Sequence, residues 1–463
     1  MIVRRTIGLC FFAVCLLCSL HAQNADSYCF RVYLKDKGAS DYSIEHPEAF
    51  LSQAAIHNRI KRGIAIDETD LPISPAYLDT LMATGTRPVT ASKWFSTVVV
   101  ESEDSAVVER IQCLPIVDSI KWVWKGQHND FQVVPRDTTR LVPVDTLVKN
   151  SVYGYAEKQI QMLNGILLHE KGYKGQGMTV AVIDAGFMNA DRLAVFDSLH
   201  LAGTHNVVFP GESVFEEDEH GTKALSCLAA NLPGLMVGTA PEATYWLIKS
   251  EDSRSEYPIE EDYWTAAVEF ADSVGVQVIS SSLGYFIYDH TDFSYQTSML
   301  DGHTALISRA AEKLADKGML LFISAGNEGY GSWEKITFPA DARHVLAVGA
   351  VTEEKEKSSF SSEGYSADGR VKPDIVALGT RCTTIDADGN VSYPNGTSFS
   401  TPTVSGLGIC LWQALPWLSN LEIIDLIQKN SSLYNSPNVK LGYGIPDMYK
   451  ILNEYQNVHE QHK

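Results

Sequence analysis

Apolar and polar positions divide the chain into two regions that differ in pattern. The first region, from about residue 28 to 125, mixes short stretches of alternating or β-branched residues with stretches of helical period. Its expected strands are 30–34, 95–100 and 117–123, and its expected helices are 52–62, 106–114 and one that opens at 74–78 with Ser74 as N-cap and Pro75 in the first turn. Such a mixture predicts an α+β sandwich of roughly 100 residues.

The second region, from residue 151 onward, alternates strands with helices. The run 178–183 is apolar without a break, as in a strand that is buried on both faces. Further expected strands are 245–248, 276–281, 319–324 and 345–351, and the expected helices are 220–230, 264–274 and 398–414. This order predicts an α/β fold with a mostly parallel sheet and right-handed crossovers.

The start of the chain and the junction between the regions have a different character. Arg4 and Arg5 precede an apolar stretch at 7–20, which is too short to span a bilayer comfortably. This pattern is typical of a secretory signal peptide, with a short membrane anchor as the alternative. The expected organisation is a signal peptide at 1–22, an α+β domain at 23–125, a linker with the processing site at 126–150 and the main domain at 151–463.

Composition and charge exclude some classes of partner. With 37 basic and 57 acidic residues the formal net charge is −20, so nucleic acid and anionic membrane surfaces are not expected to bind. Five cysteines remain after the signal peptide. Cys29 and Cys113 are a candidate pair inside the first domain, whereas Cys227 and Cys410 lie in apolar helical patterns and are expected to be buried thiols.

Three short motifs supply an acid, a base and a nucleophile in the order Asp, His, Ser. They are Val-Ala-Val-Ile-Asp-Ala-Gly at 180–186, His-Gly-Thr at 220–222 and Asn-Gly-Thr-Ser-Phe-Ser-Thr-Pro at 395–402. A serine hydroxyl needs a base to take its proton, histidine has the nearest suitable pKa, and a buried carboxylate holds the imidazole in one tautomer. Asp184 at a strand end, and His220 and Ser398 at helix starts, are the candidates.

Each of these residues alone has an ordinary interpretation as a turn or cap residue, and only their joint order is specific. Together with Ser-Ala-Gly-Asn-Glu-Gly at 324–329 and the segment 442–447, they make the chain resemble the subtilisin-like serine proteases, the subtilases. That resemblance implies the subtilisin-like three-layer fold, preceded by a small α+β propeptide domain that acts as an intramolecular inhibitor. It also implies autocleavage between residues 126 and 155.

The resemblance implies roles for two further groups of residues. Asn327 would donate its side-chain amide to the oxyanion that forms on the attacked carbonyl. A protein or peptide substrate would lie extended between two strand ends and pair through its main chain. The residues implied on the two sides are Ser282, Leu283 and Gly284 on one, and Ser324, Ala325 and Gly326 on the other.

Two places depart from the usual subtilase pattern. Phe399 follows the nucleophile where most subtilases carry Met, and acidic residues gather between 251 and 262. The acidic residues have two interpretations, selection of basic substrate side chains as in kexin-like relatives, or a solvated loop. No cofactor is required, and structural calcium rests on the family resemblance alone, because the alternating oxygen ligands at 386–390 fit a hairpin turn better.

The sequence therefore predicts a secreted serine endopeptidase that is made as an autoinhibited precursor, destined for the periplasm, the cell surface or the medium. Two alternatives stay open: a peptide ligase or cyclase that uses the same acyl-enzyme intermediate, and a non-catalytic binding protein on a protease fold. The intact set of Asp184, His220, Asn327 and Ser398 favours an enzyme over a binding protein.

Overall fold

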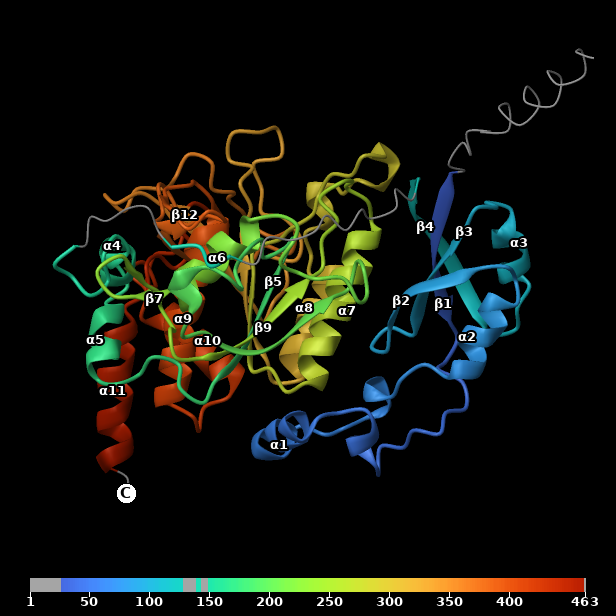
Figure 1. Cartoon of the computed structure of the whole chain (residues 1–463), viewed down its shortest axis with the longest axis horizontal. Coiled ribbons are helices and arrows are strands. Elements are labelled where there is room, and N and C mark those ends of the chain that lie inside the picture. The colour runs from blue at the N-terminus through green and yellow to red at the C-terminus, as the bar shows by residue number, and fades with distance from the viewer. Residues whose placement is uncertain (1–25, 128–138, 143–148, 462–463) are drawn as a thin grey trace, which may run out of the picture.

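The computed structural model describes residues 26–127, 139–142 and 149–461. In this part of the chain an N-terminal unit with a four-stranded sheet stands beside a larger unit with a seven-stranded sheet (Figure 1). The expected signal peptide at 1–22 and most of the linker with the expected processing site lie outside the described residues. No helix in the described ranges is both long and apolar enough to cross a membrane.

A parallel sheet forms the centre of the larger unit. Its strand order is β13-β12-β11-β10-β5-β9-β6, and every neighbouring pair runs parallel. The strands are β5 (Thr179–Asp184), β6 (His200–Asn206), β9 (Thr244–Lys249), β10 (Val278–Ser281), β11 (Leu320–Ser324), β12 (Leu346–Val351) and β13 (Ile375–Leu378). The sheet confirms the predicted α/β fold class.

Helices cover both faces of this sheet, as the crossovers of parallel strands require. One face packs against α4 (Glu157–Gln161), α5 (Gly165–Glu170), α6 (His220–Ala229), α9 (Thr397–Ala414), α10 (Asn420–Lys429) and α11 (Met448–Gln461). The other face packs against α7 (Ile259–Ser273) and α8 (Leu306–Asp316). Two short hairpins are formed by β7 (Asn231–Leu232) with β8 (Met236–Val237) and by β14 (Thr384–Ile385) with β15 (Val391–Ser392).

The N-terminal unit is an antiparallel sheet of order β2-β3-β1-β4. Its elements are β1 (Ser27–Leu34), α1 (Gln53–Arg62), α2 (Pro75–Met82), β2 (Arg87–Ser92), β3 (Thr97–Ser102), α3 (Val107–Gln112) and β4 (Val117–Gly126). Side chains alternate along β3, so Val98 and Val100 join a core under α2 and α3, whereas Val99 joins the core of α7 and α8. Both faces of this sheet are therefore buried. Helices α2 and α3 cover one face, and the larger unit covers the other.

The start of α7 and the cap of α2 differ from the predictions. Helix α7 begins at Ile259 rather than at 264, because its first turn holds Glu260, Glu261 and Asp262, where free backbone N–H groups favour carboxylates. Ser74 stands at the N-cap of α2 as predicted, but its side chain makes no capping hydrogen bond there.

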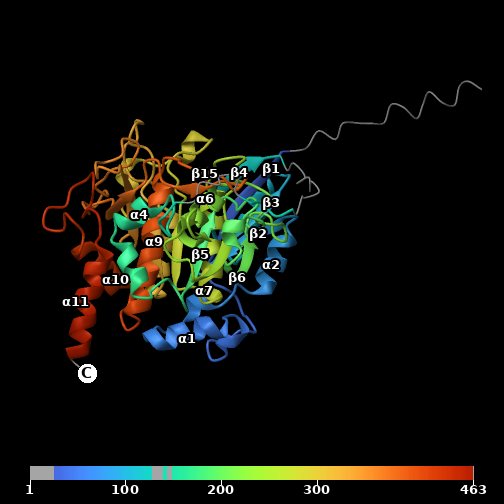
Figure 2. The same ribbon diagram turned by 60° about the vertical axis from the view of Figure 1, so that its left-hand side comes forward.

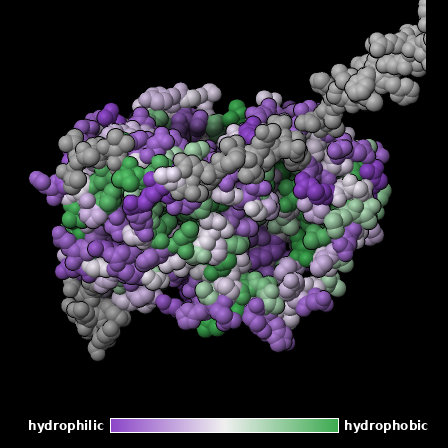
Figure 3. Space-filling model, in the orientation of Figure 1, coloured by the Kyte–Doolittle hydropathy of each residue, from purple (hydrophilic) through white to green (hydrophobic). Residues whose placement is uncertain are grey.

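The predicted pair of Cys29 and Cys113 is not formed. All five cysteines of the described residues are free thiols; Cys29 is buried against α7, while Cys113 is exposed. Cys227 and Cys410 are buried as predicted. The face of the molecule in Figure 3 carries polar residues with apolar ones among them.

Helix α1 lies away from its own sheet, beneath the larger unit (Figure 2). Ser52 caps the helix by accepting a hydrogen bond from Ala55 N, and its own N–H donates to Ser273 O at the end of α7, at 2.8 Å. Asn58 Nδ2 donates to Gly275 O at 2.9 Å. The N-terminal unit therefore contacts α7 and the residues after it in two places, through its sheet and through α1.

Polar side chains of α7 fix the sheet of the N-terminal unit. Arg31 of β1 forms a bidentate pair with Asp262, with both N–O distances at 2.6 Å and both residues buried. Further along α7, the buried Glu269 accepts hydrogen bonds from the backbone N–H groups of Lys93 at 2.8 Å and Trp94 at 3.1 Å. These contacts satisfy charges and N–H groups that the apolar junction would otherwise leave unpaired.

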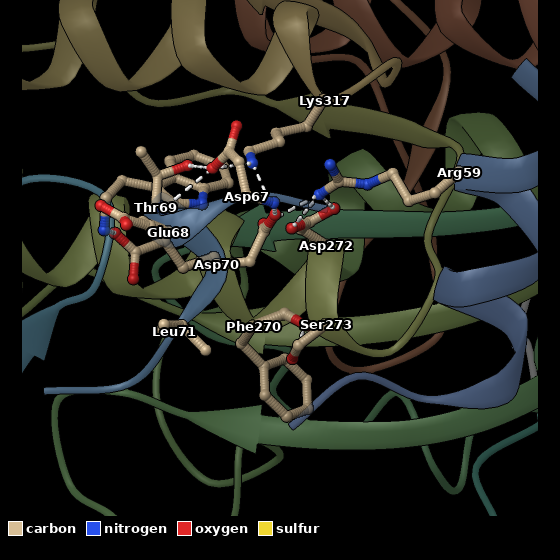
Figure 4. A network of polar contacts seen from close by, with 12 residues as sticks. Arg59, Asp67, Glu68, Thr69, Asp70, Leu71, Phe270, Asp272, Ser273 and Lys317 are labelled. Atoms are coloured by element: carbon tan, nitrogen blue, oxygen red, sulfur yellow. Dashed lines mark hydrogen bonds and ion pairs between the residues drawn. The ribbon is translucent and has the colours of Figure 1, made fainter. Parts of the chain in front are cut away.

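A buried ion-pair network joins α1 and the segment after it to the larger unit (Figure 4). Arg59 lies 2.7 Å from Asp272 of α7 and 3.3 Å from Asp70. Lys317, which follows α8, lies 2.8 Å from Asp70. All four side chains are at most 4% exposed, so the charges depend on one another rather than on water.

This network predicts that Arg59→Ala weakens the attachment of the N-terminal unit strongly. The substitution leaves the carboxylate of Asp272 buried without its cation, so we expect the free energy of unfolding of the full chain to fall by roughly 3–5 kcal/mol. Urea denaturation followed by tryptophan fluorescence measures the change in chains that also carry Ser398→Ala, which is expected to keep them whole. The matched control is Arg110→Ala, which removes an exposed ion pair with Asp104 and is expected to cost about 0–1 kcal/mol. Equal effects of the two substitutions would contradict the prediction.

Candidate active site

The three predicted chemical side chains meet at the carboxyl edge of the parallel sheet. Asp184 is the last residue of the inner strand β5, between β10 and β9. His220 is the first residue of α6, and Ser398 is the second residue of α9. Ligand sites of open α/β sheets collect at this edge, because strand ends and helix starts face one another there.

Asp184 holds the imidazole of His220 in one orientation. His220 Nδ1 lies 2.7 Å from Asp184 Oδ1, which also accepts a hydrogen bond from Ala185 N at 2.8 Å. Asp184 is fully buried, and its Oδ2 has no hydrogen-bond partner among the described residues. The contact fixes Nδ1 as the carboxylate-facing nitrogen and turns Nε2 away from Asp184.

The charges around His220 make it a stronger base than an ordinary histidine. Burial lowers the pKa of His220, but the charge of Asp184 and the hydrogen bond to it outweigh burial, and with the charges of Glu251 and Asp218 they raise the pKa to about 9. Burial and repulsion by Asp184 raise the pKa of Glu251 to about 7. The site therefore binds protons more tightly than isolated side chains would.

Glycines let helix α6 approach the end of β5. A Cβ on Gly221 would lie 2.2 Å from Gly186 O and 2.9 Å from the Asp184 Cβ. A Cβ on Gly186 would lie 1.9 Å from Glu217 O. All three separations are below van der Waals contact, so the distance between His220 and Asp184 depends on the absence of side chains at these two positions.

A proline inside α9 links Ser398 to the neighbouring strand end. Pro402 lies four residues after Ser398 and has no N–H, so it leaves the carbonyl of Ser398 without its usual helical hydrogen bond. Ser282 fills this place, because its Oγ donates to Ser398 O at 2.9 Å. The Ser398 backbone is thereby fixed against the segment that follows β10.

The residue after Ser398 packs against the imidazole of His220. The ring of Phe399, the next residue, packs 5.7 Å from the ring of His220 between centroids, and Phe399 is only 4% exposed. Among the described residues the Ser398 hydroxyl has no hydrogen bond to His220. Such bonds are often long in ligand-free sites and shorten when a substrate binds.

Asn327 is anchored at the start of α9. Its Oδ1 accepts hydrogen bonds from Thr397 N at 2.9 Å and from Thr397 Oγ1 at 3.1 Å. With the oxygen used in this way, the amide Nδ2 remains as a donor, and Asn327 is exposed. The anchor therefore holds a side chain with a remaining hydrogen-bond donor at Thr397, the residue before Ser398.

The two segments predicted to hold substrate follow neighbouring strands. Strand β10 pairs with β11, with Ser281 opposite Ile323, so the residues after them lie side by side. Ser324 Oγ lies 3.5 Å from Leu283 O across this gap. The predicted residues brought together here are Ser282, Leu283 and Gly284 after β10, and Ser324, Ala325 and Gly326 at the end of β11.

The acidic residues at the start of α7 are not a solvated loop. Glu260 and Glu261 are fully buried, and Asp262 is 4% exposed. Glu261 Oε1 accepts hydrogen bonds from the hydroxyls of Tyr288 at 3.0 Å and Tyr295 at 2.7 Å. The solvated interpretation is therefore wrong for these three residues.

One residue near the site was not expected from the sequence. Lys249, at the end of β9, is 1% exposed, lies 3.4 Å from Glu217 and donates to Glu251 O at 2.9 Å. Its Nζ also donates to Ala185 O, the residue after Asp184. The sequence feature that could have indicated this residue is a lysine at the end of the mostly apolar strand β9, which neighbours β5.

Metal ligands are not gathered in the described ranges, where no group of three or more His, Cys, Asp and Glu side chains could hold an ion. The segment 386–390 forms the predicted hairpin turn. Its Asp386 Oδ1 accepts hydrogen bonds from Asp388 N at 3.0 Å and Asn390 N at 2.8 Å, so this carboxylate is already engaged by the turn.

Comparisons with protein families match both units of the chain. Residues 175–444 match the Peptidase S8 subtilase family, and residues 29–137 match the Peptidase S8 propeptide domain of Bacteroidota. The alkaline protease of Alkalihalobacillus alcalophilus is 26% identical over 365 residues, which cover 73% of this chain and 86% of that protein. Subtilisin E of Bacillus subtilis (strain 168) is 29% identical over 278 residues, which cover 59% of this chain and 65% of that protein.

Solved structures share the fold. MycP1 from the ESX-1 type VII secretion system superposes with a TM-score of 0.51 at 21% identity, covering 69% of this chain and 94% of that chain. The MycP3 protease from the type VII (ESX-3) secretion system superposes with a TM-score of 0.52 at 22% identity, covering 70% of this chain and 98% of that chain. At this identity the likeness concerns the fold alone.

The close approach of α6 to β5 predicts that Gly221→Ala separates His220 from Asp184. A methyl group cannot fit against Gly186 O, so the helix start must move and the pKa of His220 should fall from about 9 toward its ordinary value. NMR titration of the His220 ring, identified by its loss in His220→Gln, measures this. The control is Gly331→Ala, where the nearest atom to the new methyl lies at 3.5 Å. An unchanged titration in Gly221→Ala would refute the prediction.

Proposed function

Because the chain belongs to the subtilase family, we propose that Ser398, His220 and Asp184 are the nucleophile, the general base and the orienting carboxylate of its active site. Family membership makes the protein a serine-type endopeptidase with a propeptide domain. The observation that carries the assignment is the 2.7 Å contact of His220 Nδ1 with the buried Asp184, beside the start of the helix that bears Ser398.

In the proposed reaction Ser398 Oγ attacks the carbonyl carbon of the cleaved peptide bond while His220 Nε2 takes the hydroxyl proton. The histidine then gives this proton to the leaving amine, and water hydrolyses the acyl-enzyme in the second half of the cycle. Asp184 keeps its negative charge and stabilises the imidazolium that forms between these steps. The pKa of about 9 at His220 favours uptake of the proton from serine.

The negative charge on the attacked carbonyl oxygen needs donors that are already in place. We assign this role to Asn327 Nδ2 and to the backbone N–H of Ser398. The two hydrogen bonds from Thr397 to Asn327 Oδ1 support the assignment, since they leave the amide as the outward-facing group. The start of α9 adds the positive end of a helix dipole.

The N-terminal unit is proposed to be an inhibitor that the enzyme removes from itself. Its boundaries are taken as 23–125, with processing inside the linker 126–150 and a mature domain at 151–463. The contacts of its sheet with α7 support a tight intramolecular complex, since Arg31 and Asp262 are both buried in it. Secretion through the signal peptide at 1–22 belongs to the same proposal.

The test is expression of the full chain beside Ser398→Ala, with the intact mass followed over time. Wild type is expected to lose about 12–15 kDa, a figure that follows from a propeptide of ordinary domain size. Ser398→Ala is expected to stay whole, because it lacks the nucleophile. Ser400→Ala is the matched control, since Ser400 lies on the same helix with its hydroxyl bonded to Thr397 O at 3.0 Å. Equal trimming of wild type and Ser398→Ala would contradict autocleavage.

The raised pKa of His220 predicts an alkaline enzyme. Only the neutral imidazole can accept a proton, so kcat/KM of the matured enzyme should rise with pH until about 9. Glu251→Gln removes a charge that raises this pKa, and the rising limb should move to lower pH. Glu242→Gln, a change at a half-buried carboxylate that pairs with Lys174, is the control and should leave the limb in place. A limb that ends near pH 6.5 in wild type would contradict the prediction.

A further inference from the structure

Thr337 lies between the two segments that are proposed to hold the substrate. Its backbone N–H donates to Ala325 O at 3.0 Å, which ties it to the segment after β11. The next residue, Phe338, pairs with Tyr285 through hydrogen bonds of 2.9 and 3.0 Å, which ties it to the segment after β10. The backbone of residues 337–338 therefore bridges both sides of the gap and is held from both.

The side chain of Thr337 fills the space between the two glycines of these segments. A Cβ on Gly284 would lie 2.3 Å from Thr337 Oγ1, and a Cβ on Gly326 would lie 2.8 Å from Thr337 Cγ2. The hydroxyl thus lies close to both glycines, and the methyl group lies against Gly326. Thr337 is 3% exposed, so the two segments and its own neighbours enclose it almost completely.

A second side chain closes the same space on the side of Gly326. Ser362 Oγ would lie 2.8 Å from a Cβ on Gly326, and it accepts a hydrogen bond from Glu328 N at 3.0 Å. Ser362 is fully buried. Two small hydroxyl side chains therefore lie against Gly326, and that of Thr337 lies against Gly284 as well.

We propose that Thr337 forms the floor of the pocket for the substrate side chain on the acyl side of the cleaved bond, and that the enzyme cleaves after small residues such as alanine, serine and glycine. This inference rests on the proposed function. An aromatic or long aliphatic side chain would have to displace Thr337, whose backbone is hydrogen-bonded to Ala325 and whose neighbour is paired with Tyr285. In a closely packed pocket one excess methylene already costs about 10- to 200-fold in kcat/KM.

The test compares peptide substrates that differ only in this residue: alanine, serine, leucine, phenylalanine and lysine. For the matured wild-type enzyme we expect kcat/KM for the alanine and serine peptides to exceed that for the phenylalanine peptide by at least about tenfold. Thr337→Gly removes the floor and should raise the phenylalanine-to-alanine ratio by about tenfold or more. Thr337→Ser keeps the hydroxyl and is the matched control, with an expected change well below that of the glycine variant.

Preference of the wild type for phenylalanine or leucine would overturn the inference, and so would preference for lysine, which would assign selection to the half-buried carboxylate of Glu328. An unchanged ratio in a folded Thr337→Gly enzyme would overturn it as well. If that variant does not mature, the wild-type profile decides alone. Labelling of Ser398 by a fluorophosphonate separates the two proposals, because a labelled enzyme with the wrong preference refutes only the role of Thr337.

Discussion

A buried carboxylate at the end of an inner strand is the constraint on which the site depends. Asp184 has no access to water, so its charge needs partners within the protein, and the Ala185 N–H and the His220 imidazole provide them. This requirement brings α6 and the residues just before it, Glu217 and Asp218, close enough that glycine is the only residue that fits at positions 186 and 221. The raised pKa of His220 follows from the same contact, so geometry and basicity have one cause.

Helix α7 connects the site with the N-terminal unit. Its residue Glu260 accepts a hydrogen bond from Asp252 N, next to Glu251, whose charge acts on His220. From Asp262 onward the helix carries the docking carboxylates Asp262, Glu269 and Asp272. Acidic residues that the sequence left open between substrate selection and solvation therefore serve largely as internal partners of the chain itself. A single helix thus sets both one edge of the site and the attachment of the unit that packs against it.

The sequence predicted the α/β class because β5, β10, β11 and β12 are short apolar runs separated by helical patterns. Strand β6 was missed, because it lies at the sheet edge and most of its residues are exposed, so no apolar run marks it. The candidate residues followed from the order of the motifs. The hydrogen bond from Ser282 to the Ser398 carbonyl, which Pro402 leaves unpaired within α9, joins residues 116 positions apart and could not be predicted from the sequence. The position of Thr337 could not be predicted either, because only the fold places it between Gly284 and Gly326.

The two-faced sheet of the N-terminal unit has a consequence for the direction of activation. Val99 and Trp94 are buried only because α7 and α8 cover them, and Arg31 keeps its charge in an apolar place only opposite Asp262. Once separated, the unit would expose this face to water and keep only the core beneath α2 and α3. The separated unit would then unfold readily and could not bind the enzyme again. In the proposed activation, the conversion of precursor to free enzyme would therefore be irreversible.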